Sequence, residues 1–176
     1  LLGALSARGQ DELEQRYQEA IESFSSARME DACELLQQVE KEKPGYKQTK
    51  TYLNAACSQV KRMVQMEESL YNEGVQFLNQ SRFDDAKQKF EQVNKIPLKN
   101  PKYRSQINRH LKEIDSRLNE DRLFDEGTKL FAEGKHAEAR GRFSQVSQGG
   151  GPKAANAREY LAKIEEADRR QRAADE

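Results

Sequence analysis

Two histidines and two cysteines are the side chains of this 176-residue chain best suited to metal binding or catalysis. Imidazole and thiolate groups are zinc ligands, and both serve as nucleophiles or bases in active sites. His110 and His136 are 26 residues apart, and neither has a cysteine at the spacing of a zinc motif. Carboxylates are abundant, as expected of helical surfaces. We therefore expect no metal site, no catalytic residue and no enzyme activity.

A glycine run at Gly149, Gly150 and Gly151 is the stretch best suited to approach a phosphate group. A phosphate-binding loop also needs a preceding strand, and a lysine and a hydroxyl residue in a fixed order after the glycines. The run lacks that combination. The sequence therefore predicts no bound cofactor.

The elements that position these residues follow a pattern that occurs three times. The copies begin at Tyr17, Tyr71 and Phe124, so they start 54 and 53 residues apart. In each copy, small residues stand three and ten positions after the first aromatic residue, and alanine stands at fifteen. These positions are Ala20, Ala27 and Ala32; Gly74, Ser81 and Ala86; and Gly127, Gly134 and Ala139. A fixed period of this kind is typical of stacked repeat arrays, in which each unit needs its neighbours to bury its apolar face.

The spacing resembles the tetratricopeptide repeat (TPR), W-x2-L-G-x2-Y…A-x3-F…P. The second copy shows it as Gly74, Phe77, Ala86, Phe90, Val93 and Pro97. The third shows it as Gly127, Leu130, Ala139, Phe143, Val146 and Pro152. The first is looser, with Ala20, Ser23, Ala32, Leu36, Val39 and Pro44. The resemblance covers residues 13–167 and implies an all-α array of helix-turn-helix units.

The chain departs from that family in three ways. The tryptophan position holds Arg16, Leu70 and Leu123, and the leucine position holds glutamate in every copy. The family's period is about 34 residues, and each copy here is longer by roughly one further helix. We therefore expect a degenerate three-repeat variant with an extra helix per repeat. The expected repeats are 11–66, 67–120 and 121–172, with tails at 1–10 and 173–176. Because the chain begins with Leu1, we expect a fragment or a processed form.

The extra segment of each repeat has its own apolar stripe. Apolar residues recur 36, 40, 43 and 47 positions after the repeat start, as in Leu53, Cys57, Val60 and Val64 or Ile107, Leu111, Ile114 and Leu118. The third copy continues less regularly, through Tyr160, Ile164, Ala167 and Gln171. Spacings of four, three and four place a stripe on one face of a helix.

The third helix of one repeat is expected to continue into the first helix of the next. No proline and only one glycine interrupt 46–79, and the same holds for 102–133. The sequence predicts two joining helices of about 30–35 residues each, roughly 45–52 Å long, and seven distinct helices if both are continuous. The alternative is a bend near Glu67 and Glu68 and near Asn119 and Glu120.

Small residues are expected to let helices approach closely inside each repeat. Ala20, Gly74 and Gly127 would face Ala32, Ala86 and Ala139, and Gly134 and Asp84 would end and cap helices. Cys33 and Cys57 fall on the second and third helices of the first repeat and would lie near each other. We expect buried free thiols there, with a disulfide as the alternative. His136 is expected to be a packing residue.

Charge and hydropathy narrow the classes of partner. Lys and Arg number 30, as do Asp and Glu, so no net field favours nucleic acid or an anionic membrane. No apolar run approaches the ~20 residues of a membrane span. The low cysteine count favours a reducing compartment, and we expect a cytoplasmic location.

The resemblance implies a binding face on the first helix of each repeat. Transferred by position, the partner-binding residues are Glu14, Gln18 and Ile21; Glu68, Asn72 and Val75; and Asp121, Asp125 and Thr128. The first member of each trio is acidic, which would suit a protein or peptide with spaced basic residues; the alternative is that these acids are merely solvated. The lysine and asparagine with which some family members grip chaperone tails are replaced here by Tyr17 and Ile21.

The function expected from these features is a non-catalytic protein–protein interaction scaffold. It would bind a peptide or a partner helix on the face of its first helices. The alternative is a structural spacer or a self-associating helical rod, whose apolar stripes would pair with another copy of the chain.

Overall fold

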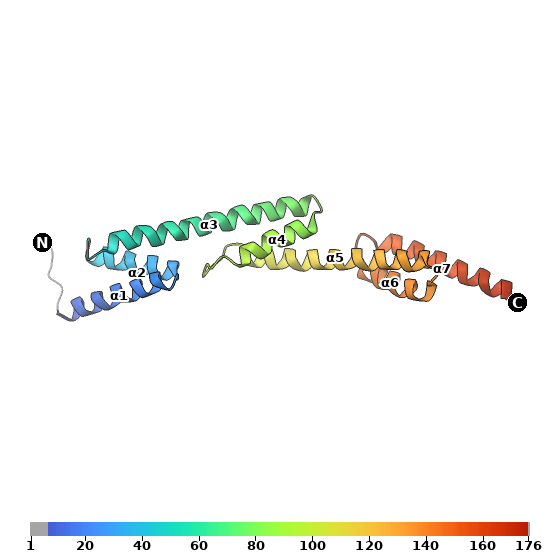
Figure 1. Cartoon of the computed structure of the whole chain (residues 1–176), viewed down its shortest axis with the longest axis horizontal. Helices are drawn as coiled ribbons and strands as arrows, with labels where there is room; N and C mark the ends of the chain where they lie inside the picture. Colours follow the sequence, from blue (N-terminus) through green and yellow to red (C-terminus); the bar gives the residue numbers. More distant parts are fainter. Residues whose placement is uncertain (1–6, 176) are drawn as a thin grey trace.

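The computed structural model describes residues 7–175, and within that range the protein is all-α, with seven helices and no strand. The helices follow one another along an elongated molecule, with α1 and α7 at its opposite ends (Figure 1). Their bounds are α1 Ala7–Ser25, α2 Met29–Glu42, α3 Thr49–Asn79, α4 Phe83–Asn94, α5 Arg104–Ala132, α6 His136–Gly149 and α7 Ala154–Asp175. The all-α fold class is confirmed.

Two long helices join the repeats. α3 has 31 residues and α5 has 29, and neither is interrupted near 67–68 or 119–120, so the prediction of continuous joining helices is confirmed. Each spans about 45 Å at ~1.5 Å per residue. Residues 7–10, at the end of the first predicted tail, belong to α1, and residues 173–175 of the second belong to α7. Residues 1–6 and 176 lie outside the described range.

The described chain has three hydrophobic cores, each enclosed by three helical segments. The N-terminal unit consists of α1, α2 and the first half of α3; its core contains Leu36 and Val39. The middle unit consists of the second half of α3, α4 and the first half of α5, around Phe90 and Ile114. The C-terminal unit consists of the second half of α5, α6 and α7; its core contains Phe143, Val146 and Ile164. Because α3 and α5 each contribute to two units, the three-helix units are joined end to end.

The small residue of the first helix provides the space for the large residue of the second. A Cβ atom added to Gly74 would lie 2.6 Å from Cε1 of Phe90, and one added to Gly127 would lie 2.8 Å from Cε1 of Phe143. The alanines of the second helix are fully buried, as expected, but the atoms closest to both glycines belong to the phenylalanine rings. The glycines therefore make room for the phenylalanine rings.

The hairpin turns adopt the same backbone conformation in all three units. Ala27, Ser81 and Gly134 all have positive φ, at 58°, 57° and 72°. The expectation for Gly134 is confirmed, and the other two turns place a side chain in a conformation that favours glycine. Asp84 is not the cap of α4: Arg82 holds that position without a side-chain cap, and Asp84 lies in the first turn, where its charge suits the helix dipole.

The stripe read from the sequence is confirmed in the middle unit, where Ile107 and Ile114 are buried, but the buried positions of the other two third helices stand at different distances from the repeat start. Each third helix has two buried residues seven positions apart, Thr49 and Ala56, Ile107 and Ile114, and Ala157 and Ile164, and α7 also buries Ala154. The preceding loops differ in length, at 43–48, 95–103 and 150–153, so counting from the repeat start misaligns the helices. Val64 is consequently 45% exposed, and Gln171 is exposed.

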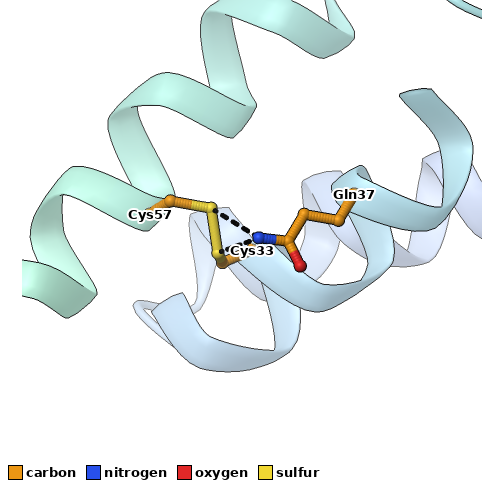
Figure 2. The surroundings of a disulfide bond; sticks show 3 residues. All are labelled: Cys33, Gln37 and Cys57. Atoms are coloured by element: carbon orange, nitrogen blue, oxygen red, sulfur yellow. Dashed lines mark hydrogen bonds between the residues drawn. A yellow bond between two sulfur atoms is a disulfide. The ribbon is translucent and has the colours of Figure 1, made fainter. Parts of the chain in front are cut away.

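A disulfide joins Cys33 of α2 to Cys57 of α3, and the Nε2 group of Gln37 lies against both sulfur atoms (Figure 2). The Cα atoms are 5.1 Å apart, which suits the bond. The two residues lie near each other as expected, but the expectation of free thiols is wrong. Thiol pairing depends on distance across the helix packing, which sequence spacing does not record.

Candidate interaction surface

In two units, a lysine from the loop before the third helix reaches the first trio residue of the predicted binding face. Lys47 forms an ion pair with Glu14 in the N-terminal unit, and Lys153 lies 2.8 Å from Asp121 in the C-terminal unit. Each lysine also lies over the aromatic residue that begins the repeat, with Nζ 5.1 Å from the ring centroid of Tyr17 or Phe124. Each lysine ammonium thus contacts both a carboxylate and the face of an aromatic ring, and the second contact is a cation–π interaction.

Glu14 is the acid most firmly engaged within its own unit. It accepts hydrogen bonds from Gln18, Lys47 and the hydroxyl of Tyr46. These donors stabilise the carboxylate and lower the pKa of Glu14 from an ordinary value of 4.5 to about 2, with the Gln18 bond first among the causes. Two of the three acids that begin the predicted trios, Glu14 and Asp121, therefore form ion pairs inside the molecule.

The middle unit is arranged differently. Tyr103 stacks on Tyr71, with ring centroids 4.0 Å apart and planes 9° from parallel. The backbone N–H of Tyr103 donates to Glu67, whose side chain is buried, at 3.1 Å. Tyr103 thus lies against the aromatic residue that begins the repeat, where the other two units have a lysine. Glu68 is left exposed, with no hydrogen bond or ion pair among the described residues, and its charge reaches Lys102 only at longer range.

The other predicted face residues fall into two groups. Gln18, Asn72 and Asp125 are exposed; Gln18 donates to Glu14, and Asp125 lies 3.9 Å from the Nζ atom of Lys153. Ile21 and Val75 are half-buried and pack against the cores of their own units. Thr128 is also half-buried, and its hydroxyl donates to the carbonyl oxygen of Asp125 at 2.8 Å. The third member of each trio therefore supports the fold or its own helix at least as much as it offers a surface.

The three trios do not come together in one groove. They lie on α1, on the second half of α3 and on the second half of α5, which follow one another along the molecule (Figure 1). The N-terminal and middle units also meet through the α4–α5 loop, where Lys99 forms an ion pair with Asp31 and its backbone N–H donates to Glu30. The arrangement presents separate faces, one to a unit.

Sequence reasoning missed two features of this surface. The first is the set of loop lysines, which could have been found because a lysine stands one or two residues before each third helix: Lys47, Lys102 and Lys153. The second is the continuation of the middle face along α3 to Val64 and Lys61. Val64 had been assigned to a buried stripe, and its exposure could not be seen without the loop lengths.

The histidines occupy packing positions. His136 stacks on Phe131 with ring centroids 5.4 Å apart, as expected, and His110 stacks on Phe90 at 5.2 Å. Among residues 7–175 no group of three or more His, Cys, Asp and Glu side chains is placed to hold a metal ion. No helix in the same range is long and apolar enough to cross a membrane.

The chain matches no protein-family model, no curated protein and no solved structure. The resemblance to tetratricopeptide repeats therefore depends on the residue pattern alone.

Proposed function

We propose that this protein is a non-catalytic protein–protein interaction scaffold that binds a peptide or a partner helix on the face of its first helices. The observation that carries the proposal is the free face of the middle unit. There Glu68 and Asn72 are exposed on one side of a rigid helix, and no other part of the described chain covers them. An exposed carboxylate two helical turns from the half-buried Val75 suits a partner with a basic residue and an apolar one at a matching spacing.

The units bind separately in this proposal. Because the faces lie one after another along the molecule, a long partner would meet them in turn, while a short peptide would occupy one unit. The middle face carries the most binding energy, since Glu14 and Asp121 would have to give up lysine contacts before they could pair with a partner. This differs from the concave groove that the family resemblance implies.

A structural spacer is the second candidate, and a specific observation favours it. α3 and α5 run without interruption through the junctions between units, so they fix the distance between the two ends of the molecule. A rod of this kind would hold apart whatever is attached at each end. The two candidates are compatible, because a spacer can also carry a binding face.

Affinity capture with matched charge reversals tests the scaffold proposal. The face variant carries Glu68→Lys and Asp125→Lys. The control variant carries Glu113→Lys and Glu159→Lys, exposed acids on α5 and α7 that form no ion pair with any residue of 7–175. A partner that binds the wild-type and control chains, fails to bind the face variant and cross-links to a probe at Asn72 supports the proposal. Equal binding by all three chains contradicts it.

The compartment is also a proposal. A disulfide forms and persists in oxidising environments and is rare in the cytosol. The Cys33–Cys57 bond therefore favours an oxidising compartment over the cytoplasmic location expected from the cysteine count. Thiol labelling of the chain recovered from its native source, under denaturing conditions, decides between them: two reactive thiols indicate a reducing compartment.

A further inference from the structure

Lys61, Val64 and Glu68 form one stripe along the exposed side of α3. They follow one another at spacings of three and four residues, so they lie one above another on the helix surface. Lys61 and Glu68 are two helical turns apart, or about 10.5 Å along the axis. Asn72 continues the same stripe into the middle-unit face. We call Lys61, Val64 and Glu68 the α3 stripe.

No side chain of the α3 stripe forms a hydrogen bond or an ion pair in the part of the chain that the structure describes, and Glu68 interacts with Lys102 only at longer range. Lys61 and Glu68 are exposed and form no hydrogen bond or ion pair there, although many other charged side chains of the molecule are paired. Val64 is 45% exposed and is one of two exposed large apolar side chains in residues 7–175. The other, Met66, is two residues away and so lies on a different side of the helix.

The order of these residues is self-complementary for antiparallel pairing. The segment reads Lys61-Arg62-Met63-Val64-Gln65-Met66-Glu67-Glu68, with basic residues at one end and acidic residues at the other. A two-fold axis midway between positions 64 and 65 places Lys61 of each copy level with Glu68 of the other copy, so two such pairs form. The same axis brings the two Val64 side chains together at the centre.

We infer that the α3 stripe binds the α3 stripe of a second copy of this chain, antiparallel, across a two-fold axis. A two-fold interface uses the same patch on both copies, and this patch supplies both the cation and the anion that such an interface needs. Parallel pairing would place Lys61 against Lys61 and Glu68 against Glu68, which like-charge repulsion disfavours. The inference rests on the proposed interaction function and names the partner of the α3 part of that surface.

Charge reversal tests the pairing in both directions. Lys61→Glu gives a stripe with two acidic groups, and Glu68→Lys gives a stripe with two basic groups. Each variant alone is expected to be monomeric, whereas an equimolar mixture of the two is expected to form a one-to-one dimer. The double variant Lys61→Glu, Glu68→Lys restores complementarity within one chain and is expected to dimerise like the wild type. Sedimentation equilibrium up to about 1 mM covers the weak affinity expected of a small interface.

The two exposed apolar residues supply a matched control. Val64→Ser is expected to weaken the wild-type dimer at least tenfold, while Met66→Ser is expected to leave it unchanged, because Met66 lies outside the stripe. All these positions are exposed or half-exposed, so the variants should keep the wild-type circular dichroism spectrum and melting temperature.

A wild-type chain that remains monomeric up to about 1 mM overturns the inference, and so does a dimer that the charge reversals do not affect. Neither result touches the scaffold proposal, which is tested with a different protein as partner and with a variant that also changes Asp125. Conversely, equal capture by all chains in that experiment leaves the self-association results standing.

Discussion

The N-terminal and middle units have the same three-helix arrangement but secure the third helix differently. In the N-terminal unit the Cys33–Cys57 disulfide ties α3 to α2. In the middle unit the buried carboxylate of Glu67, from the first helix, accepts the N–H of Tyr103 at the start of α5. The N-terminal unit has Leu13 at the position of Glu67, four residues before the repeat start.

The cores of these two units differ in a matched pair of positions. The N-terminal unit has Ala20 with Leu36, and the middle unit has Gly74 with Phe90. The smaller residue on the first helix accompanies the larger one on the second, so the shared volume is kept. The comparison shows that both units keep the combined volume of the core pair and keep one bond that holds the third helix. The residues that fill the volume, and the kind of bond, differ between the units.

Removing the disulfide should produce the largest change in stability, and the change should be confined to the N-terminal unit. Cys33→Ala with Cys57→Ala opens a cross-link between residues 24 apart in sequence, which should lower the free energy of unfolding by about 3 kcal/mol. Hydrogen exchange should speed up in α2 and the first half of α3 and stay unchanged in α7, because the units have separate cores. Uniform acceleration along the whole chain would contradict the independence of the units.

A smaller effect is expected from exchanging the core pair. Gly74→Ala places a Cβ atom 2.6 Å from the Phe90 ring and should cost about 1–3 kcal/mol of stability in urea unfolding. Adding Phe90→Leu converts the middle unit to the alanine–leucine pair of the N-terminal unit and should recover part of that loss. If the double variant is less stable than the sum of the single changes predicts, the two positions do not share one volume.

The hydrogen bond between Glu67 and the backbone N–H of Tyr103 can be tested by replacing Glu67 with leucine, the residue that the N-terminal unit has at this position. Glu67→Leu leaves the backbone N–H of Tyr103 without its acceptor and should lower the free energy of unfolding by about 1–3 kcal/mol. Glu67→Gln keeps an acceptor and should cost less. Thermal unfolding of both variants beside the wild type measures the difference, and equal stability of the two variants would show that the hydrogen bond is unimportant.

Ala27 and Ser81 hold positions where the C-terminal unit has Gly134. Because all three have positive φ, Ala27→Gly and Ser81→Gly should raise stability, by about 0.5–1 kcal/mol each. Gly134→Ala should lower it by a similar amount. The melting temperatures of the three variants give the answer, and a loss of stability on replacing Ala27 would mean that its methyl group contributes packing that outweighs the backbone strain.

The smallest effect concerns pH and is limited to the N-terminal unit. The pKa of Glu14 is about 2 in the folded chain, below its ordinary value of 4.5, so its contribution to stability is complete above about pH 4.5 and is lost as the pH falls toward 2. A Glu14→Gln chain should lack this component of the acid-induced loss. Melting temperatures between pH 6 and 2 test this, and parallel curves for the two chains would contradict it.

A large part of the fold could be predicted from local patterns. The aromatic, small and apolar residues at fixed positions predict helical hairpins, and the absence of proline between 46 and 79 predicts the continuous α3. The site was harder to predict. The nine face residues were assigned by transfer from the family pattern. No local pattern shows that Lys47 and Lys153 form ion pairs with Glu14 and Asp121 while Glu68 forms none in the described chain.

The sequence alone determined the helices, their repeat and the positions of the turns, because helical periodicity and glycine or proline preferences act over a few neighbouring residues. The tertiary structure decided the register of the third helices, the disulfide and the exposure of Val64. These depend on how far each loop carries the chain before the next helix packs, and on distances between residues that are remote in sequence.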